Sequence, residues 1–423
     1  LEAAQSEAER MALRVIFRYA RVNGVESYLP ISNAHIDGCT YIGPGGLDYT
    51  RRLLEAGGQV CVPTTLNSIS TDRNNWQRLE VPRDRAENSI ALANAYLDLG
   101  CQPSFTCAPY LLSNPPSFGE DVAWGESNAV VYCNSVLGAR TEKYADYLDI
   151  CCAIAGVVPA TGVHLTENRR PKIVLDGRNV FHELFLDNEQ RVDLDLLFPT
   201  LGHLCGRLSD GRVPIVLGLE TVSDKISNDH LKAFCAAFGT TAASPLVHVA
   251  GVTPEAKEPA IVNDFVKDCT DVHDIMLSDL SETFDQLNSS TTDKIDLVAL
   301  GNPHLSTTEC RDLATLMRGT VKHSDTRIMA CISQQVYDSA DRYHIQAMRD
   351  FGVELIFDTC WCMLLDVPVV PTDKSATILT NSGKYAHYGP GLTQRQYRYG
   401  SMYDCVQAAA YGVYPRSSQT LFR

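Results

Sequence analysis

Short apolar runs alternate along this chain with longer segments of helical spacing. Each apolar run is followed by small or polar residues and then by a stretch in which apolar positions recur with a helical period. This alternation favours an α/β fold with largely parallel sheets. The pattern predicts strands over 59–62, 172–174, 213–217, 246–248, 297–300, 326–332 and 355–357.

The segments between these runs predict helices, and polar stretches suggest where the chain divides. We predict helices over 3–23, 84–99, 229–237, 255–264, 306–316 and 340–351. Polar stretches near 168–171 and 289–294 are candidate boundaries, and we see no repeat of fixed period. We therefore expect three parts: a first α/β subdomain over 1–169 with most of the site loops, a second α/β lobe over 170–290, and a third α/β subdomain over 291–423 with C-terminal site loops.

Composition and charge narrow the classes of partner. The chain has 423 residues, more than one typical hydrophobic core, and is 45% hydrophobic and 21% charged. A net charge of −15 argues against nucleic acid and against an anionic membrane surface. No apolar stretch reaches the roughly 18–20 residues of a membrane span, and no signal peptide is visible in the charged first helix.

Cysteine usage predicts a reducing compartment. The 15 cysteines are odd in number and scattered, and several stand in apolar runs such as the one around Cys151 and Cys152. This is unlike a secreted disulfide scaffold, so we expect a cytoplasmic protein in which most thiols are buried as small hydrophobic groups.

Cys107 and Cys360 differ from the other cysteines in their surroundings. Each stands in a short, nearly uncharged stretch with hydroxyl and small neighbours, and the stretch that holds Cys360, 358–362, directly follows the apolar run 353–357. A thiol at the end of a strand suits an iron–sulfur ligand, because backbone N–H groups there can be aimed at sulfur. A zinc site is disfavoured, because Cys360-x-Cys362 has the wrong spacing for a zinc knuckle and no C-x-x-C pair would complete a four-ligand site. A serine hydrolase is disfavoured, because the sequence has no G-x-S-x-G motif.

Loops of low charge hold the other candidate chemistry. Between residues 31 and 41, His35 and Asp37 alternate and would share a face of an extended chain, and the following glycines do not have the spacing of a dinucleotide fold. Thr64, Thr65 and Asn67 offer neutral hydrogen bonds to a carboxylate or phosphate, or else form a helix N-cap cluster.

A segment with polar residues on an apolar helix follows further along the chain. Glu126 is a candidate general base and Arg140 a candidate carboxylate clamp, although the two could equally form a structural ion pair. The later loops 301–304 and 380–391 combine imidazoles, Lys384 and glycines, but the second lacks the spacing of a phosphate-binding P-loop.

Taken together, these loops resemble the aconitase X family, the divergent branch of the aconitase superfamily. The matching stretches follow the order of that family from about residue 25 to the end: they are 35–39, 63–67, 106–110, 126–141, 164–169, 248–256, 301–304, 358–360 and 381–391.

The resemblance implies a large catalytic module of about three α/β subdomains around an iron–sulfur site. Members of the family are lyases that remove water from a hydroxylated substrate. One branch dehydrates cis-3-hydroxy-L-proline to a pyrroline carboxylate, and a two-chain branch dehydrates mevalonate 5-phosphate. The stretch His35 to Cys39 is similar to the hydroxyproline branch, which makes that hydro-lyase activity the leading expectation. The alternatives are a family dehydratase or isomerase acting on another hydroxy acid, mevalonate 5-phosphate included, and a non-catalytic subunit without a cluster.

Two departures from the family pattern shape the expected cofactor and partner. Asn302 stands where the phosphomevalonate branch has a cysteine, so the resemblance leaves Cys107 and Cys360 as ligands, with Cys39 as the candidate third. A reduced ligand set favours [2Fe–2S] over [4Fe–4S] or [3Fe–4S]. The small swivelling domain of the family is not visible in this sequence, so we expect a small partner subunit or a fused domain outside it.

The roles implied for the site residues complete these expectations. His35 and Asp37 would handle protons at the leaving hydroxyl, and Glu126 would be the base. Binding of the small hydroxy-acid substrate would fall to Ser32, Thr64, Thr65, Asn67, Ser127, Asn128, Arg140 and Lys384.

Overall fold

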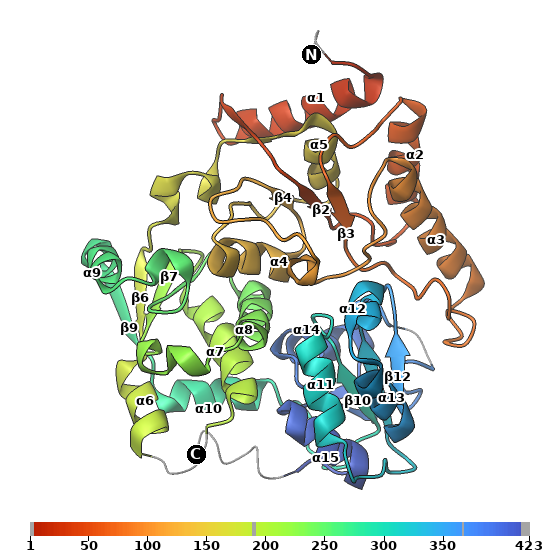
Figure 1. The fold of residues 1–423 in the computed structure, drawn as a ribbon, viewed down its shortest axis with the longest axis vertical. Coiled ribbons are helices and arrows are strands. Elements are labelled where there is room, and N and C mark those ends of the chain that lie inside the picture. Colours follow the sequence, from red (N-terminus) through yellow and green to blue (C-terminus); the bar gives the residue numbers. More distant parts are fainter. Residues whose placement is uncertain (1–3, 188–191, 366–367, 416–423) are drawn as a thin grey trace.

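Parallel sheets organise three successive parts of the chain. The computed structural model describes residues 4–187, 192–365 and 368–415. Within these residues there are parallel sheets of three, four and five strands, and one separate antiparallel pair. Figure 1 shows the N-terminal part at the top, with the middle and C-terminal parts side by side below it. The α/β class predicted from the sequence is confirmed.

The first part places a short parallel sheet beneath the N-terminal helices. Its strands are β1 (Tyr28–Pro30), β2 (Ala34–Ile36), β3 (Thr64–Leu66), β4 (Ala123–Trp124) and β5 (Val157–Pro159). Its helices are α1 (Glu7–Val22), α2 (Pro44–Glu55), α3 (Arg83–Asp98), α4 (Ser127–Tyr132) and α5 (Leu148–Ala155). The parallel sheet has the order β3-β2-β4, and β1 pairs with β5. α1 buries Ala8, Ala12, Ile16 and Ala20, at a spacing of four residues, on a side that packs against α5.

The second part is a lobe built on a four-stranded parallel sheet, ordered β8-β7-β6-β9. Its strands are β6 (Ile173–Asp176), β7 (Pro214–Leu217), β8 (His248–Val249) and β9 (Asp271–Asp274). Its helices are α6 (Arg178–His182), α7 (Leu194–Leu208), α8 (Asn228–Thr241), α9 (Pro259–Asp268) and α10 (Leu277–Gln286). β9 is an edge strand with every residue exposed, whereas β7 is buried throughout.

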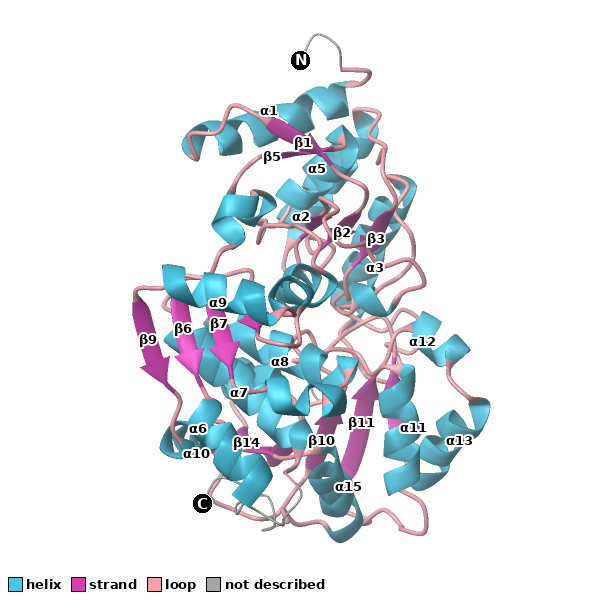
Figure 2. Ribbon diagram, turned by 60° about the vertical axis from the view of Figure 1, so that its left-hand side comes forward, coloured by secondary structure: helices cyan, strands magenta, loops and turns pink. Residues whose placement is uncertain are grey.

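The third part carries the five-stranded parallel sheet, ordered β12-β11-β10-β13-β14. Its strands β10, β11 and β14 are labelled in Figure 2. Its strands are β10 (Leu297–Leu300), β11 (Arg327–Cys331), β12 (Val353–Ile356), β13 (Thr377–Thr380) and β14 (Gln396–Tyr399). Its helices are α11 (Thr307–Leu316), α12 (Gln334–Ser339), α13 (Arg342–Phe351), α14 (Gly383–Thr393) and α15 (Met402–Tyr411). Strands buried on both faces explain the continuous apolar runs of the sequence.

Helices α4 and α8 join the parts at the centre of the molecule. α4 belongs to the first part, yet Val130 and Val131 lie in the same hydrophobic core as Phe234 and Phe238 of α8. α8 also contacts α14 of the third part. Figure 1 shows α8 between these two helices. We keep 1–169, 170–290 and 291–423 as proposed bounds of the parts, and each parallel sheet lies within one of them.

Two predictions about local structure are wrong. Residues 59–62 are not a strand, because the backbone N–H groups of Val60 and Cys61 donate to Leu99 and Ala153, outside any ladder, and the strand begins at Thr64. Most of 380–391, taken as a loop, is helix α14. Its glycine at 389 faces the ring of Tyr397, where a Cβ atom would clash, so this glycine serves close packing. Of the predicted 3–23 helix, residue 3 lies outside the described residues.

Candidate active site

The carboxyl ends of two parallel sheets converge on one site. Asp37 and Asn67 follow β2 and β3, and Glu126 follows β4. From the other side, Asn302 follows β10 and Lys384 lies in the first turn of α14, after β13. The carboxyl ends of strands in open α/β sheets are the usual place for ligands. The two sets of strand ends meet directly, because Lys384 Nζ lies 2.6 Å from Glu126 Oε1.

One amide joins the two carboxyl groups of the site. Asn67 Nδ2 donates to Asp37 Oδ1 and, at 3.2 Å, to Glu126 Oε2. The other oxygen of Glu126 accepts from Asn128 Nδ2 at 2.7 Å and from Lys384. Asn128 is itself fixed, because its amide also donates to Cys107 O and its oxygen accepts from Tyr110. The sequence prediction that these groups belong to one site therefore agrees with their contacts, while their roles stay predictions.

The two carboxyl groups have opposite preferences for a proton. Burial opposes ionisation of Glu126, but the Lys384 ammonium and the Asn128 donors outweigh it and lower the pKa of Glu126 to about 2. Burial and the neighbouring carboxylates of Glu126, Asp146 and Asp149 raise the pKa of Asp37 well above its usual range. A pair whose pKa values are pushed apart can divide the roles of acid and base.

Three thiols lie beside this carboxyl pair. Cys360 lies in hydrogen-bonding contact with Cys107 and Cys362, and the contact with Cys107 contributes most to raising the pKa of Cys360 to about 12. Two N–H groups point at the neighbouring sulfurs: His304 N donates to Cys107 Sγ at 3.3 Å, and Asn302 Nδ2 donates to Cys362 Sγ at 3.2 Å. Thiols met by N–H donors form the kind of environment that an iron–sulfur ligand needs.

Cys39, the predicted third ligand, has other partners. Its thiol is fully buried and donates to Ile36 O at 3.4 Å and Asn67 O at 3.2 Å. Within the described ranges, no group of three His, Cys, Asp or Glu side chains is arranged around a point that suits a single metal ion. A cluster carries its own bridging sulfides and spans more than one ion. The contact between Cys107, Cys360 and Cys362, with N–H donors on two of the sulfurs, therefore fits such a group.

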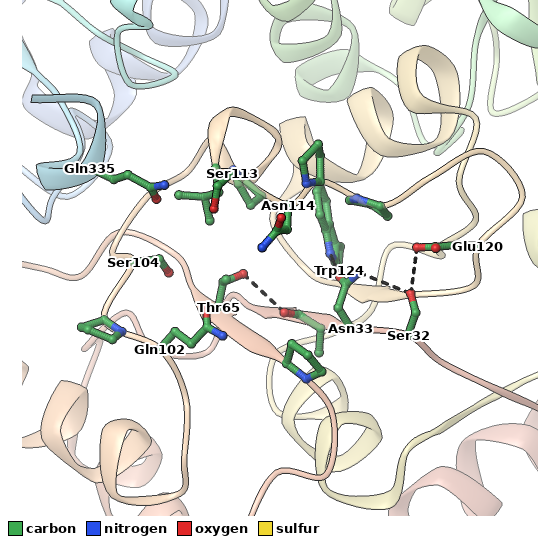
Figure 3. A pocket seen from close by; sticks show the side chains of 17 residues that line it. Ser32, Asn33, Thr65, Gln102, Ser104, Ser113, Asn114, Glu120, Trp124 and Gln335 are labelled. Atoms are coloured by element: carbon green, nitrogen blue, oxygen red, sulfur yellow. Dashed lines mark hydrogen bonds between the residues drawn. The ribbon is translucent and has the colours of Figure 1, made fainter. Parts of the chain in front are cut away.

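A cavity of about 610 Å³ is lined in part by Thr65, two residues before Asn67 (Figure 3). His35 Nδ1 lies 2.8 Å from Thr65 Oγ1, and Thr65 lines the cavity with Ser32 and Trp124. Burial lowers the pKa of His35 to about 3, so its imidazole is neutral at ordinary pH. The remaining side chains of the lining are mainly uncharged, with Gln335 contributed by the third part.

Several predicted substrate-binding residues have structural contacts of their own. Arg140 donates to His164 O at 2.7 Å and Thr166 Oγ1 at 2.9 Å, so its guanidinium is not the partner of Glu126. Thr64 is buried and donates to Val62 O, and Ser32 on the cavity rim donates to Glu120. Ser127 lies next to Glu126, with Oγ donating to Oε1 at 3.4 Å.

Sequence reasoning missed two functional candidates. Cys362 was set aside with the zinc motif, although its position two residues after Cys360 is a signal for a shared site. Asp149 stands in the apolar stretch of α5, where a fully buried carboxylate is unusual. It accepts from Asp37 N at 2.6 Å and from Ile150 N at 2.7 Å, and thus holds the loop that carries Asp37. Burial raises the pKa of Asp149 to about 7.

This fold and this site define an α/β protein in which the ends of parallel strands bring together two buried carboxyl groups, one lysine and three cysteine thiols. The chain belongs to the aconitase X family: the models of its first, second and third domains match residues 1–167, 179–285 and 295–411. The chain resembles a solved structure titled Thermococcus kodakaraensis aconitase X (holo-form), with a TM-score of 0.79, 27% identity and 95% of each chain covered. The family predicted from the sequence is confirmed.

Relatives of established activity are dehydratases. The chain is 44% identical to a cis-3-hydroxy-L-proline dehydratase of Pseudomonas aeruginosa, over 98% of the chain and 69% of that protein. It is also 44% identical to the same enzyme of Hypocrea jecorina, of which it covers 68%. The phosphomevalonate dehydratase large subunit of Methanosarcina mazei is 30% identical and is covered over 95% of its length. None of the described helices is long and apolar enough to span a membrane.

Proposed function

We propose that this chain is the large catalytic module of a hydro-lyase that dehydrates cis-3-hydroxy-L-proline. The observation that carries the proposal is the Asn67 amide, which holds Asp37 and Glu126 together while their surroundings favour opposite protonation states. Removal of water from a hydroxy acid needs one base and one acid close together. The choice of substrate rests on the 44% identity to two hydroxyproline dehydratases, against 30% to the phosphomevalonate relative.

In the proposed reaction Glu126 accepts the proton of C2, next to the substrate carboxylate. Asp37 gives its proton to the C3 hydroxyl, which leaves as water, so that a C2=C3 double bond forms and the product rearranges to pyrroline-2-carboxylate. Asn67 and Asn128 orient Glu126, and Ser127 and Lys384 are the nearest groups for the substrate carboxylate. His35, neutral and bonded to Thr65, would move protons between the site and the cavity.

We propose an iron–sulfur cluster as the cofactor, held by Cys107 and Cys360 with Cys362 or Cys39 as the third ligand. When bound, the group supplies a Lewis acid for the leaving oxygen. The donors Asn302 and His304 and the nearby Lys384 cation suit the negative charge of thiolates. Asn302 in place of a cysteine favours [2Fe–2S] over larger clusters.

We further propose a cytoplasmic enzyme that works with a small module. All fifteen cysteines are unpaired, which suits a reducing compartment. The phosphomevalonate relative is by name a large subunit and is covered almost completely, whereas 31% of the Pseudomonas relative has no counterpart here. A partner subunit or a fused domain would supply that part.

Anaerobic purification with iron and sulfide quantitation, followed by a substrate panel, tests the proposal. The loaded chain is mixed with the uncovered part of the Pseudomonas relative, produced separately, and given cis-3-hydroxy-L-proline or mevalonate 5-phosphate. Formation of pyrroline-2-carboxylate from the first substrate is the expected result. Water loss from mevalonate 5-phosphate alone would favour the second candidate function, dehydration of another hydroxy acid. A chain that takes up no iron and turns over neither substrate would be a non-catalytic member of the family.

A further inference from the structure

The second lobe contributes none of the carboxyl or thiol groups of the site, yet its helix α8 contacts three segments of the site, which carry Glu126, Lys384 and the N–H donors to the thiols. At Gly239 an added Cβ atom would lie 3.1 Å from Ser127 O, so α8 lies directly against the start of α4. α8 also contacts Gly383, the residue before Lys384: a Cβ atom added to Gly383 would lie 3.2 Å from Ala237 Cβ. The third contact is made by Lys232, and it is ionic.

Lys232 is a fully enclosed charge, with 2% of its surface exposed. Its ammonium donates to His304 O at 3.2 Å, contacts Glu309 Oε2, and lies 3.4 Å from Asp229 Oδ1. Burial opposes its charge, but the two carboxylates outweigh burial and raise the pKa of Lys232. A buried ion pair often stabilises a fold no more than well-packed apolar side chains would, so the partners of Lys232 are a better guide to its role than its contribution to stability.

The target of Lys232 is the loop 301–306 between β10 and α11, and this loop holds the thiols. Its Asn302 amide donates to Cys362, its His304 N–H donates to Cys107, and the His304 ring contacts Thr359 O at 2.8 Å. The carboxylates that hold Lys232 also hold this loop. Ser306 N donates to Glu309 at 2.8 Å, and Ser306 Oγ donates to Asp229 at 2.9 Å.

We propose that Lys232 is a positioning residue: with Glu309 and Asp229 it fixes the loop 301–306 so that Asn302 and His304 aim their N–H groups at the sulfurs of Cys362 and Cys107. The inference rests on the proposed function in that these thiols hold the cofactor. N–H donors to ligand sulfurs set the reduction potential of an iron–sulfur cluster. The second lobe thereby acts on the cofactor through one buried lysine.

Hydrogen–deuterium exchange of the metal-free full chain tests the positioning directly. Lys232→Met should speed exchange of the amides in 301–306 at least tenfold, while the amides of β10 and β11 keep their protection. Lys232→Arg should restore part of the protection. The matched control is Lys322→Met, because Lys322 also donates to backbone carbonyls, of His323 and Thr326, away from the loop. It should leave 301–306 unchanged.

A second variant covers the case in which Lys232→Met fails to fold. Lys232→Met with Glu309→Leu removes one of the two carboxylates that paired with the lysine. The other, Asp229, is partly exposed, so the double variant should fold, with the loop still deprotected. A folded double variant with wild-type exchange in 301–306 would overturn the inference. In loaded protein the single and double variants should show a more negative cluster potential, which a purely structural role would not produce. If the wild type binds no iron, the cofactor proposal fails, while the exchange result still decides the role of Lys232.

Discussion

Asp37 and Glu126 share one amide donor but differ in their other neighbours, and this difference separates their expected roles. Glu126 faces an ammonium group and the Asn128 donors, which stabilise its charge, whereas Asp37 is surrounded by carboxylates. A carboxylate that must accept a proton from carbon is a weak base while Lys384 holds it. A substrate carboxylate that attracts Lys384 would therefore strengthen Glu126 as a base at the moment of binding.

Replacement of the proposed base is the most direct test at this scale. Glu126→Gln keeps the hydrogen-bonding shape but cannot accept the proton, so we expect kcat to fall by a factor of about 10²–10⁴. Turnover of the loaded enzyme with the small module checks this. The control is Glu87→Gln, an exposed carboxyl on α3 paired with Arg83, which should keep kcat. Wild-type turnover in Glu126→Gln would remove Glu126 from the mechanism.

The contribution of the Lys384–Glu126 ion pair to stability gives a second prediction. Lys384→Met leaves the Glu126 carboxylate buried without its cation, and we expect a loss of about 3–5 kcal/mol in the free energy of unfolding at pH 7. The double variant with Glu126→Gln should recover most of this loss, because no unpaired charge remains. Urea unfolding of the two single variants and the double variant forms the cycle. Additive losses would mean that the 2.6 Å contact has no energetic coupling.

At the scale of the element, α14 is fixed to the second lobe by a pair of histidines. His203 Nε2 of α7 lies 3.0 Å from His387 Nδ1 of α14, the helix whose first turn carries Lys384. Burial, His387 and Arg207 lower the pKa of His203 from 6.5 to about 4. This contact therefore holds with a neutral imidazole.

Acid should weaken this contact between helices. Between pH 6.5 and about 4 the unfolded chain binds a proton at His203 that the folded chain does not, so this group makes stability fall as the pH is lowered. The slope is at most about 1.4 kcal/mol per pH unit. Urea midpoints at pH 7, 6 and 5 should fall less steeply in His203→Gln than in wild type. His273→Gln on the exposed strand β9 is the control and should keep the wild-type slope.

The pattern of apolar residues predicted an element correctly where the apolar run is buried and its backbone pairs within a sheet. The strand expected over 297–300 is β10, since four apolar residues buried on both faces leave no alternative. The run 59–62 has three apolar residues after Gln59, but the N–H groups of Val60 and Cys61 donate to two separate segments, a tertiary outcome that no local pattern contains. Likewise, the glycines of α14 suggest a loop when only the sequence is considered. In the structure, Gly383 and Gly389 are helical positions where neighbouring helices and the Tyr397 ring leave little room for a side chain.

The site was predictable in its residue types and less so in its pairings. Asp37, Asn67 and Glu126 were chosen for their chemistry and for the resemblance to the family, whereas the strands β2, β3 and β4 that they follow were not predicted. The partner of Lys384 did not follow from the sequence, because Glu126 is 258 residues away and the pairing depends on how two separate sheets face each other. Arg140 was chosen as a clamp for its chemistry, but its backbone pairing with Asp121 directs it to His164 and Thr166.

At the scale of the whole molecule, the three neighbouring thiols come from parts of the chain that are distant in sequence. Cys107 belongs to the first part and Cys360 and Cys362 to the third, while α8 of the second part supports the loop between them. A cofactor held by these thiols would bind only the state in which the parts are assembled. Binding to the folded state alone stabilises a protein in proportion to the logarithm of ligand concentration over its dissociation constant.

Cluster loading should therefore raise the melting temperature of the chain, and the cysteines that carry the increase are its ligands. We expect anaerobic reconstitution with iron and sulfide to raise Tm in wild type, and the rise to disappear in Cys107→Ala and Cys360→Ala. Cys405→Ala, a buried thiol in the core of the third part, should lower the starting Tm but keep the rise. The third ligand is decided by the same measurement. If the rise in Tm is lost in Cys362→Ala and kept in Cys39→Ala, the third ligand is Cys362. The reverse result would select Cys39, whose thiol would have to give up its hydrogen bonds to Ile36 O and Asn67 O when the cluster binds.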